Sequence, residues 1–498
     1  MNYFIINNIG DKLTGIEKAV INRFKLFESN HINSKILSLT WNPKLSSNAR
    51  IFDVSNHIFS IYDYFQESIS IEENTIKNWI NYWIFENKFE VKYIPNTKDV
   101  RIFSNGKKIM YVNFFDENYK YINYINHFDS KGRKIKRDLY DIRGFLSCTK
   151  YLTKKQKVLT EKFFNPSGTV KIEKYYDTDS EKNDITAILL NDYHNRNYYF
   201  ENENQFIAFF YDELYTKGDI YFSDKTANTA PPFLLTTKDI PVVAVLHSTH
   251  VKNNDNIQFS DTKNIYSSVF SNLERFSAII VSTKQQKINL DKRIASSIPV
   301  YNIPAGYKEN TEIPVDTSVP DGPVRIMSIA RYSPEKQLDH QINLISKLQK
   351  DFNNIELHLY GYGGEYNKLK ELVKDQGLEN NIKFRGFLPD LTHEMKKGHL
   401  SLITSNMEGF SLAILESISN GLPVISYDIA YGPREMINDN FNGFLITKND
   451  QVELYKKTKE LLKNKQLQQD FRKNSINKSN EFSSDNVINK WRELLKNL

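Results

Sequence analysis

The residues best suited to chemistry lie in the stretch MEGFSLAILESISNGLPVISYD, which runs from Met407 to Asp428. It places two glutamates, Glu408 and Glu416, eight residues apart, the first just ahead of a predicted helix and the second on that helix. The free backbone N–H groups and the positive dipole end of a helix start suit phosphate or sugar oxygens. Because a lone glutamate pair is usually a solvated surface feature, its interpretation depends on the other groups predicted nearby.

Two cations and two glycine turns follow predicted strands of the same region. Arg331 comes after the strand VRIMSIA, and Lys336 lies five residues later. A forked guanidinium and a compact ammonium together suit a diphosphate. The turns GYGGEY, beginning at Gly361, and FRGFLP, containing Gly386, would let a ligand approach the backbone. In parallel sheets ligands bind beyond the carboxyl ends of the strands, so these groups predict a nucleotide-sugar site with one carboxylate for the hexose and the other for the ribose.

Two histidines, His247 and His250, end another predicted strand in VVAVLHSTHVKNN. The H-x-x-H spacing suggests a metal, but no third ligand is apparent and metal-binding helices usually carry H-E-x-x-H. We therefore expect no metal. A hydrogen-bonded histidine at a strand end is the alternative to a role in the site.

The elements that must position these groups alternate between strand and helix. From Val324 the alternation is regular, which predicts a parallel sheet with helices on both faces. The first residues, NYFIIN, predict a strand, and Ile16, Val20 and Phe24 recur at helical spacing behind the turn at Gly15. This turn lacks the full G-x-G-x-x-G pattern, so it is a weak cofactor signature.

Between these regions the hydrophobic residues recur at every second position, which is the spacing of a β-strand. Short aromatic and β-branched runs from about Phe89 predict an antiparallel meander of roughly nine strands, with alternation of helix and strand returning after about Asp184. The segment from Phe89 to Asp177 holds 19 Lys and Arg against 10 Asp and Glu, a net charge of +9 in a chain whose formal net charge is +6. This concentration favours a polyanionic partner. A solvated sheet surface and a nucleic-acid-binding surface are the alternatives.

Length and composition restrict the class of protein. A chain of 498 residues with 40% hydrophobic residues predicts two or three globular domains. The one cysteine, Cys148, excludes an intramolecular disulfide and a multi-cysteine metal site. The start carries no basic segment ahead of an apolar run, and nowhere do about 18 apolar residues run together. We expect a cytoplasmic protein.

The stretch from Val324 to Leu445 resembles the retaining, nucleotide-sugar-dependent glycosyltransferases of group 1, which have the GT-B fold. The segments that carry the resemblance are SIARYSPEKQLD, LYGYGGEYNKL, IKFRGF, EGFSLAILESISNGLPVISYD and GPREMI. It implies an α/β GT-B architecture: two Rossmann-like domains facing a cleft, with the β-meander inserted in the first.

The resemblance also implies roles for individual residues. Those expected to be catalytic are His250, Arg331, Lys336 and Glu408. Those expected to bind the donor are Gly15, His247, Gly361, Gly386, Phe387, Leu388, Gly409, Phe410, Ser411, Leu412 and Glu416. His250 is matched more closely than His247 to the histidine that contacts the transferred sugar. No cofactor is implied, because the UDP-sugar is a substrate.

The inserted meander is similar to the β-sheet domain of two branches of these enzymes. One branch modifies teichoic-acid polyol phosphates, and the other adds N-acetylglucosamine to serines of serine-rich or serine–aspartate-repeat adhesins. The loop TGIEKA resembles the protein-modifying branch, which makes that function the first expectation and teichoic-acid glycosylation the alternative. An inactive GT-B partner that only holds an acceptor protein is the second alternative, disfavoured by the charged site residues. In each case no nucleic-acid partner and at most peripheral membrane contact are expected.

The expected organisation follows from these patterns. Residues 1–75 and 186–312 form the first Rossmann-like domain, 76–185 the inserted sheet, 313–480 the nucleotide-sugar domain and 481–498 a C-terminal helix. The insert is expected to form a homo-oligomer and to bind a polyanionic acceptor. The cations expected to contact that acceptor are Lys131, Arg133, Lys134 and Lys136.

Overall fold

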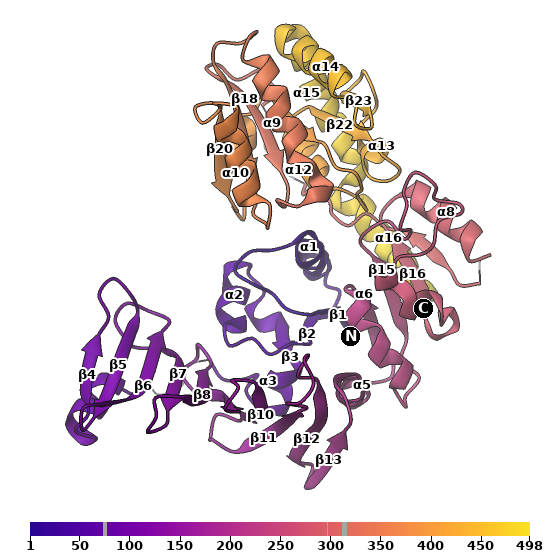
Figure 1. Ribbon diagram of the computed structural model, residues 1–498. Coiled ribbons are helices and arrows are strands. Elements are labelled where there is room, and N and C mark those ends of the chain that lie inside the picture. The colour runs from indigo at the N-terminus through magenta and orange to yellow at the C-terminus, as the bar shows by residue number, and fades with distance from the viewer. Residues whose placement is uncertain (73–76, 296, 311–315) are drawn as a thin grey trace. The chain divides into compact units, whose positions relative to one another are not determined.

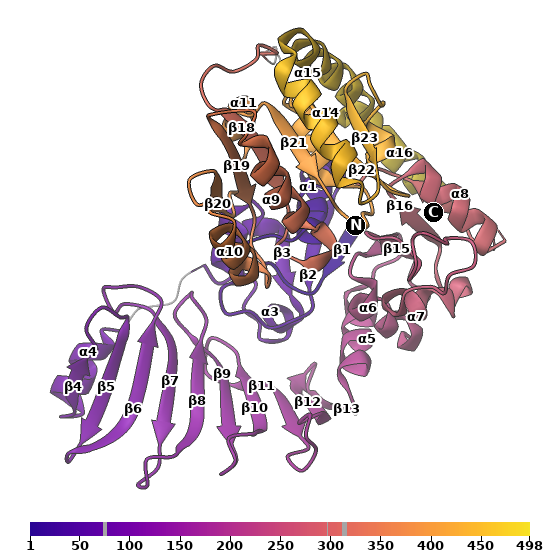
Figure 2. The ribbon, with the colours of Figure 1, turned by 45° about the horizontal axis from the view of Figure 1, so that its top comes forward.

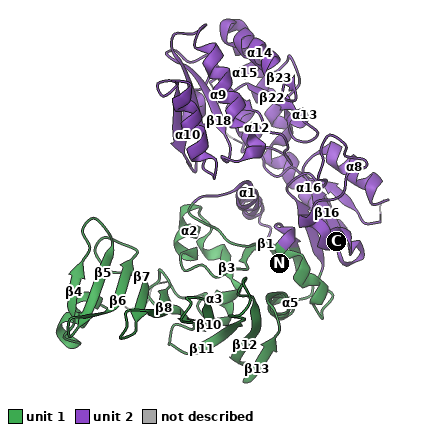
Figure 3. Cartoon of the chain, in the orientation of Figure 1, with its two compact units in different colours: residues 1–11, 34–221, 228–240 green, residues 12–33, 222–227, 241–498 purple. Residues whose placement is uncertain are grey.

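The computed structural model describes residues 1–72, 77–295, 297–310 and 316–498. The chain folds as two compact units (Figure 3): unit 1 comprises residues 1–11, 34–221 and 228–240, and unit 2 comprises residues 12–33, 222–227 and 241–498. Unit 1 contains the inserted sheet, and unit 2 contains all residues expected at the donor site. The expected domain boundaries at 75/76 and 312/313 lie outside the described residues.

Seven strands form the first sheet, in the order β17-β16-β15-β14-β1-β2-β3. Their bounds are β1 (Asn2–Ile6), β2 (Ser34–Ser38), β3 (Ile58–Ser60), β14 (Ile220–Ser223), β15 (Val242–Leu246), β16 (Ala278–Val281) and β17 (Val300–Asn302). In unit 1 β2 pairs in parallel with β1 and β3, and in unit 2 β16 pairs in parallel with β15 and β17. All five residues of β15 are buried, as expected for a strand covered on both faces.

The second parallel sheet, in unit 2, has six strands in the order β20-β19-β18-β21-β22-β23. Their bounds are β18 (Val324–Ile329), β19 (Ile355–Tyr360), β20 (Ile382–Gly386), β21 (Leu400–Ile403), β22 (Val424–Asp428) and β23 (Gly443–Thr447). Helix α9 (Leu338–Leu348) packs against α10 (Tyr366–Asp375) and α14 (Gln451–Lys463), whereas α12 (Leu412–Ser419) packs against α15 (Lys465–Ser479) (Figure 1). The strand order reverses between β18 and β21, which confirms the predicted Rossmann-like alternation and defines the position where such sheets bind ligands.

The inserted sheet, in unit 1, has ten antiparallel strands that lie side by side in chain order (Figure 2). Their bounds are β4 (Glu90–Tyr93), β5 (Asp99–Ser104), β6 (Lys107–Phe114), β7 (Ile122–Phe128), β8 (Lys134–Tyr140), β9 (Leu146–Leu152), β10 (Val158–Phe164), β11 (Val170–Tyr176), β12 (Ile185–Tyr193) and β13 (Arg196–Phe200). The meander therefore extends past the expected end at residue 185, and helices return only at α5 (Glu203–Leu214). The last hairpin was missed because its turn, His194–Asn195, has positive φ at both residues without a glycine.

The ten-stranded sheet changes its covered face along its length. Around β5 to β8 the buried cluster of Val100, Ile102, Val112 and Ile125 packs against Trp83. Further along, contacts come from α3 (Ile61–Phe65) and α5: the rings of Tyr62 and Phe163 of β10 lie 4.8 Å apart, and those of Phe206 and Phe200 of β13 lie 5.4 Å apart. An antiparallel sheet needs only one apolar face at any point, so the opposite face of β6 to β8 is left for polar and aromatic side chains.

The remaining helices are short connections, apart from three longer ones. The short helices are α2 (Leu45–Ile51), α4 (Trp79–Asn81), α6 (Thr226–Thr229), α7 (Ser267–Phe270), α11 (Thr392–Lys396) and α13 (Pro433–Met436). The longer ones are α1 (Gly15–Ser29), α8 (Lys284–Arg293) and the predicted C-terminal helix α16 (Ser484–Asn497). Trp491 of α16 is buried. None of the described helices is long and apolar enough to cross a membrane.

A buried arginine ties the inserted sheet to the α3 segment within unit 1. Arg143, in the turn after β8, donates from Nε to Asp141 Oδ1 and from Nη2 to Asp63 Oδ1, each at 2.7 Å. Its Nη1 donates to the Ser68 carbonyl at 2.7 Å. Two carboxylates from separate segments thus share one guanidinium, which satisfies three buried charges together.

We expect Arg143→Ala to destabilise unit 1 by about 3–5 kcal/mol, because it leaves the two buried carboxylates without their cation. Differential scanning calorimetry would show the unit 1 transition moving to lower temperature. Arg133→Ala is the matched control, since Arg133 pairs with Asp129 in an exposed turn and such pairs contribute about 0–1 kcal/mol. Equal melting shifts for the two variants would contradict the anchoring role of Arg143.

Candidate active site

An ion pair joins two loops at the reversal of strand order in the six-stranded sheet. Lys336 Nζ, in the turn Pro334–Lys336 that follows β18, lies 2.7 Å from Oε1 of Glu408, in the loop after β21. Ser405 Oγ donates to the same carboxylate oxygen at 2.7 Å. The Lys336 and Glu408 side chains are only 16% and 12% exposed, so solvent screens their attraction little. The predicted cation and the predicted carboxylate are thus in direct contact.

Hydrogen bonds to backbone carbonyl oxygens hold these two loops together. Thr404 Oγ1 donates to the carbonyl oxygens of Lys336 and Gln337, at 2.9 and 3.0 Å. The Asn406 N–H donates to the Glu335 carbonyl at 2.8 Å. The Lys336–Glu408 pair therefore rests on a rigid backbone frame, which favours a preorganised site.

The second predicted cation, Arg331, occupies a more open position. Its side chain is 55% exposed, and its Nη2 lies 2.8 Å from Glu335 Oε1. Exposed pairs of this kind are worth about 0–1 kcal/mol, so Arg331 can exchange its carboxylate for a phosphate at small cost.

A further cation, Lys263, was not predicted: its Nζ donates to Ser248 Oγ at 3.1 Å, and burial lowers its pKa. Lys263 lies outside any motif, so no pattern in the sequence marked it.

The loop that leads into α12 is packed without spare room. A Cβ on Gly409 would lie 2.3 Å from the carbonyl oxygen of His247, so only glycine fits. Phe410 is buried against Phe482, with ring centroids 5.8 Å apart. Ser411, the N-cap of α12, has φ +73°, a left-handed conformation unusual for serine. Next, Leu412 packs against Gly306. The helix start that the sequence predicted as an oxygen-binding position is thus fixed beside the end of β15.

Glu416, on α12, is paired with a residue that sequence reasoning missed. Lys18 Nζ, on α1, lies 2.6 Å from Glu416 Oε1, and both side chains are partly exposed. The start of α1 is held by a reciprocal capping arrangement of Thr14 and Glu17. Nothing lies within 4 Å of a Cβ built on Gly15, so the space above this turn is open. Lys18 stands three residues after Gly15, a helical spacing that could have identified it.

Close packing against backbone atoms requires glycine in the turn that follows β19. At Gly361, with φ +142°, a Cβ would meet the Ala330 carbonyl oxygen at 1.9 Å, and at Gly363 it would meet that of Tyr332 at 2.3 Å. These glycines let the turn after β19 lie directly on the segment that carries Arg331. Gly386 ends β20 and accepts a hydrogen bond from the Gly361 N–H at 2.8 Å.

The two residues after Gly386 form the outer part of the same turn. The Phe387 ring lies edge-on to Tyr362, with ring centroids 6.1 Å apart, and Leu388 is exposed. Their expected contact with the base of the donor stays a prediction.

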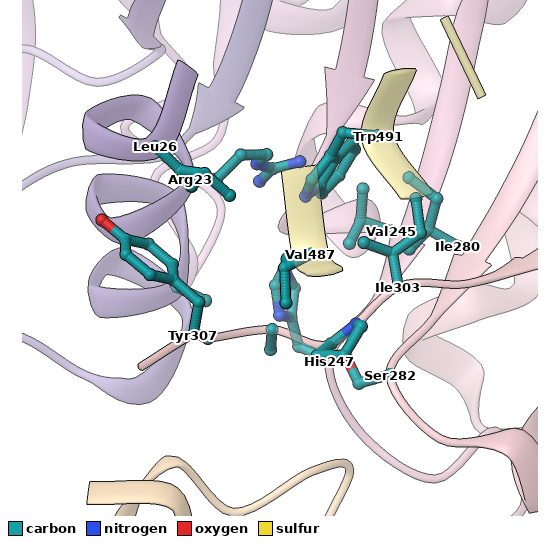
Figure 4. Close-up of a pocket in the computed structure, with 14 residues that line it drawn as sticks. Arg23, Leu26, Val245, His247, Ile280, Ser282, Ile303, Tyr307, Val487 and Trp491 are labelled. Carbon is teal, nitrogen blue, oxygen red and sulfur yellow. The ribbon is translucent and has the colours of Figure 1, made fainter. Parts of the chain in front are cut away.

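His247 begins a buried polar network at the end of β15. Its Nε2 lies 2.7 Å from Oδ1 of Asp224, and Arg23 Nη2 donates to the same oxygen. Asp224 directly follows β14, and its contact with α1 joins residues about two hundred positions apart, which no local pattern in the sequence marks. His247 also lines a mostly apolar pocket with Tyr307 and Trp491 (Figure 4).

His250 has a different environment from His247. Its side chain is fully buried, and neither ring nitrogen has a hydrogen-bond partner among the described residues. It stacks on Tyr431, with ring centroids 6.1 Å apart. Burial, with smaller effects from Arg293 and Lys263, lowers its pKa to about 4, so the ring is neutral at pH 7. Within the described residues no three His, Cys, Asp or Glu side chains are grouped to hold a metal ion.

The four predicted acceptor cations, in unit 1, do not share one face of the inserted sheet. Lys134 and Arg133 line an open hollow on the face that presents Tyr111, Tyr124 and Phe128. Lys136 pairs across the sheet with His127 and bonds to Asp138 at 3.2 Å, on the side opposite to the Asn126–Arg137 pair. Lys131 is exposed in the turn between β7 and β8. Lys154, in the turn between β9 and β10, also lines the hollow.

The pKa of His250 predicts a pH dependence of stability. The unfolded side chain titrates near 6.5 and the folded one near 4, so the unfolded state binds more protons between these values. Stability is therefore lost as pH falls through this window, by about 2 kcal/mol between pH 8 and pH 5. The melting temperature should fall more steeply with acid for the wild type than for His250→Gln. Parallel pH dependences would show that His250 titrates normally in the fold.

Two family models match the chain. The model described as glycosyl transferases group 1 matches residues 309–478, and a model of an accessory Sec system protein matches residues 12–372. The first covers the six-stranded sheet with Arg331, Lys336, Glu408 and Glu416, and the second covers most of the rest of the chain.

Curated relatives extend over nearly all of the chain. The poly(glycerol-phosphate) alpha-glucosyltransferase of Bacillus subtilis (strain 168) is 24% identical over 514 residues, which cover 98% of this chain and 74% of the relative. The UDP-N-acetylglucosamine–peptide N-acetylglucosaminyltransferase GtfA subunit of Streptococcus pneumoniae is 25% identical over 524 residues, covering 100% and 99%.

A solved structure shares the fold. The pneumococcal O-GlcNAc transferase GtfA, in complex with UDP and GlcNAc, superposes with a TM-score of 0.87 at 22% identity, over 99% of this chain and 98% of that one. With its two parallel Rossmann-like sheets and inserted antiparallel sheet, the chain has the GT-B fold and belongs to this accessory Sec system protein family, and its residues 309–478 form a domain similar to the group 1 glycosyltransferases.

Proposed function

We propose that this protein is a retaining glycosyltransferase that moves N-acetylglucosamine from its UDP-sugar to serine hydroxyls of a serine-rich or serine–aspartate-repeat protein. The observation that carries the proposal is the Lys336–Glu408 pair, held by Ser405 beside the start of α12. A partner that only bound a protein would have no need of a mostly buried cation and carboxylate poised at the ligand edge of a Rossmann-like sheet.

The proposed roles follow from charge and position. Glu408 accepts hydrogen bonds from hexose hydroxyls, and Glu416 accepts from the ribose. Lys336 and Arg331 exchange their present carboxylates for the diphosphate oxygens and stabilise the charge that develops on the leaving group. Electrostatic stabilisation by preorganised groups of this kind accounts for much of the rate enhancement of many enzymes.

The proposed reaction retains the anomeric configuration. The acceptor oxygen bonds to the anomeric carbon as the bond from that carbon to the phosphate oxygen breaks. UDP leaves with the electron pair, and its phosphate takes the serine proton. This route suits the site, because it requires no nucleophilic carboxylate and gives the phosphate-binding cations the main catalytic role.

Support for the acceptor class comes from similarity and charge. The chain matches the pneumococcal peptide N-acetylglucosaminyltransferase over the whole length of both proteins, but it covers only 74% of the poly(glycerol-phosphate) glucosyltransferase. Teichoic-acid glycosylation is therefore the second candidate, because the relative that acts on a polyol phosphate is almost as similar. A homo-oligomer formed through the inserted sheet stays a prediction for light scattering.

Product mass spectrometry tests the function. The enzyme is offered UDP-N-acetylglucosamine or UDP-glucose, with either a serine–aspartate-repeat peptide or a poly(glycerol phosphate). We expect peptide serines to gain N-acetylhexosamine. Exclusive transfer to the polyol phosphate would replace the proposal by the second candidate, and binding of the peptide with no turnover of either donor would indicate an inactive partner.

Variants at the ion pair test the proposed roles. Lys336→Ala should cost on the order of 3 kcal/mol, about a hundredfold in rate, since it removes charge stabilisation of the leaving group. Glu408→Ala should abolish transfer but leave UDP affinity equal or higher, because Lys336 is then free for phosphate. Calorimetry is the measurement. Loss of UDP binding by Glu408→Ala would contradict its assignment to the hexose.

The hollow of the inserted sheet is the proposed contact for the acceptor. Its cations and aromatic rings form an open surface that is complementary to a chain of regularly spaced negative charges. Such attraction is screened within about 8 Å at physiological ionic strength. It therefore acts on long acceptors that lie along the sheet.

We expect Lys134→Gln with Lys154→Gln to raise the apparent KM for a long acceptor severalfold while the KM for a single-serine peptide stays the same. The effect should shrink as salt rises. Lys136→Gln is the matched control, because Lys136 contacts Asp138 outside the hollow. If the control and the double variant behave alike, the hollow is not the acceptor contact.

A further inference from the structure

Three side chains of unit 2 form a buried charge network behind the active site. Asp224 Oδ1 accepts from His247 Nε2 at 2.7 Å and also from Arg23 Nη2. The Asp224 side chain is fully buried, and its other oxygen, Oδ2, has no hydrogen-bond partner among the described residues. A buried carboxylate with an unsatisfied oxygen is costly, so its retention points to a role other than packing.

Arg23 is held in place by aromatic rings. Its guanidinium carbon lies 5.5 Å from the centroid of the Phe222 ring and 5.1 Å from that of Trp491. Figure 4 shows the Arg23 side chain extending from α1 toward Trp491. Trp491 comes from α16 and also packs edge-on against Phe27, with ring centroids 5.4 Å apart. The C-terminal helix thus closes over the cation that supports Asp224.

This network determines which nitrogen of His247 carries a proton. Arg23 Nη2 donates to Asp224 Oδ1, so that oxygen is an acceptor and carries no proton. A carboxylate only accepts, so the His247 nitrogen that faces it, Nε2, is the donor. In the neutral ring the lone pair is therefore on Nδ1.

His247 is also joined by its backbone to the sugar-binding loop. Its carbonyl oxygen lies 2.3 Å from the position that a Cβ on Gly409 would occupy, and Gly409 directly follows Glu408. A change in the orientation of the His247 residue would therefore displace the loop that carries Glu408, the residue proposed to bind the hexose. No comparable network holds His250, whose ring nitrogens are both without partners among the described residues.

We infer that Asp224 and Arg23 are positioning residues, which fix the Nε2–H tautomer of His247, leave its Nδ1 as an acceptor and hold the residue against Gly409 of the loop that carries Glu408. The inference rests on the proposed function. Trp491 completes the arrangement by keeping water from Arg23. Arg23 and Asp224 act through His247.

The test separates orientation of His247 from general stability. Asp224→Leu removes the oxygen that accepts from Nε2 and keeps a side chain of similar size, so no acceptor fixes the proton on that nitrogen. We expect kcat to fall on the order of 10- to 100-fold, as for other residues that orient a functional imidazole, with the KM for the UDP-sugar within about twofold. Arg23→Lys should retain more activity than Arg23→Met, because the charge beside Asp224 is kept.

The matched control is Asp141→Leu in the inserted sheet. Asp141 is also buried and bonded to an arginine, Arg143, but to no histidine. We expect it to lower the melting temperature without changing kcat. A loss of kcat that followed melting temperature in both variants would overturn the inference.

A direct readout is the ¹⁵N spectrum of labelled histidine, with the His247 signals assigned from a His247→Gln variant. The wild type should show Nε2 protonated, and Asp224→Leu should change that pattern. An unchanged tautomer in Asp224→Leu would overturn the inference. If the wild type turned over no UDP-sugar, the proposed function would fail, while the spectrum would still report whether Asp224 sets the tautomer.

Discussion

The parallel pairing of β18 with β21 is the constraint on which the active site depends. These strands are separated by about seventy residues of chain, yet Ile326 and Met327 lie opposite Leu400 and Ser401. The pairing reverses the strand order and brings the loop after each strand to the same edge of the sheet. Lys336 and Glu408 meet there, 2.7 Å apart, because no helix separates their loops. Without the pairing of β18 with β21, Lys336 and Glu408 would each be a mostly buried charge without its partner.

Close backbone contact repeats around this edge. Gly361 and Gly363 let the turn after β19 press on the segment from Ala330 to Tyr332, and Gly409 lets the start of α12 press on His247. In each case the atom that leaves no room for a Cβ is a backbone carbonyl oxygen, which cannot rotate away. The glycines therefore fix distances between strand-end loops, and a larger residue would displace functional groups as well as destabilise the fold.

Buried arginines perform the same task in both units. Arg143 joins the inserted sheet to α3 through Asp63 and Asp141, and Arg23 joins α1 to the end of β14 through Asp224. A guanidinium has five donors in a fixed plane, so it can bind carboxylates from separate segments where a lysine would bind fewer. The difference lies in what else the carboxylate binds. Asp224 also binds His247, which connects a structural pair to the chemistry of the site.

The sequence by itself determined the fold class and the inserted sheet, and it marked the charged residues that meet at the edge of the six-stranded sheet. Hydrophobic period and turn residues are local properties, so the strands and helices around Arg331, Lys336, Glu408 and Glu416 could be predicted. The hairpin at His194–Asn195 could not, because its left-handed turn has no glycine. The sequence also could not predict that Lys134 lines the hollow whereas Lys136 lies outside it, because that depends on strand register.

Only the tertiary structure decided which charges meet. Lys18 reaches Glu416, Arg23 reaches Asp224, and Lys336 reaches Glu408, across separations of many residues. A sequence pattern reports what lies near along the chain, whereas an ion pair depends on which strands become neighbours and which way their loops turn. That choice is made by burial of whole strands and helices, and no single motif contains it.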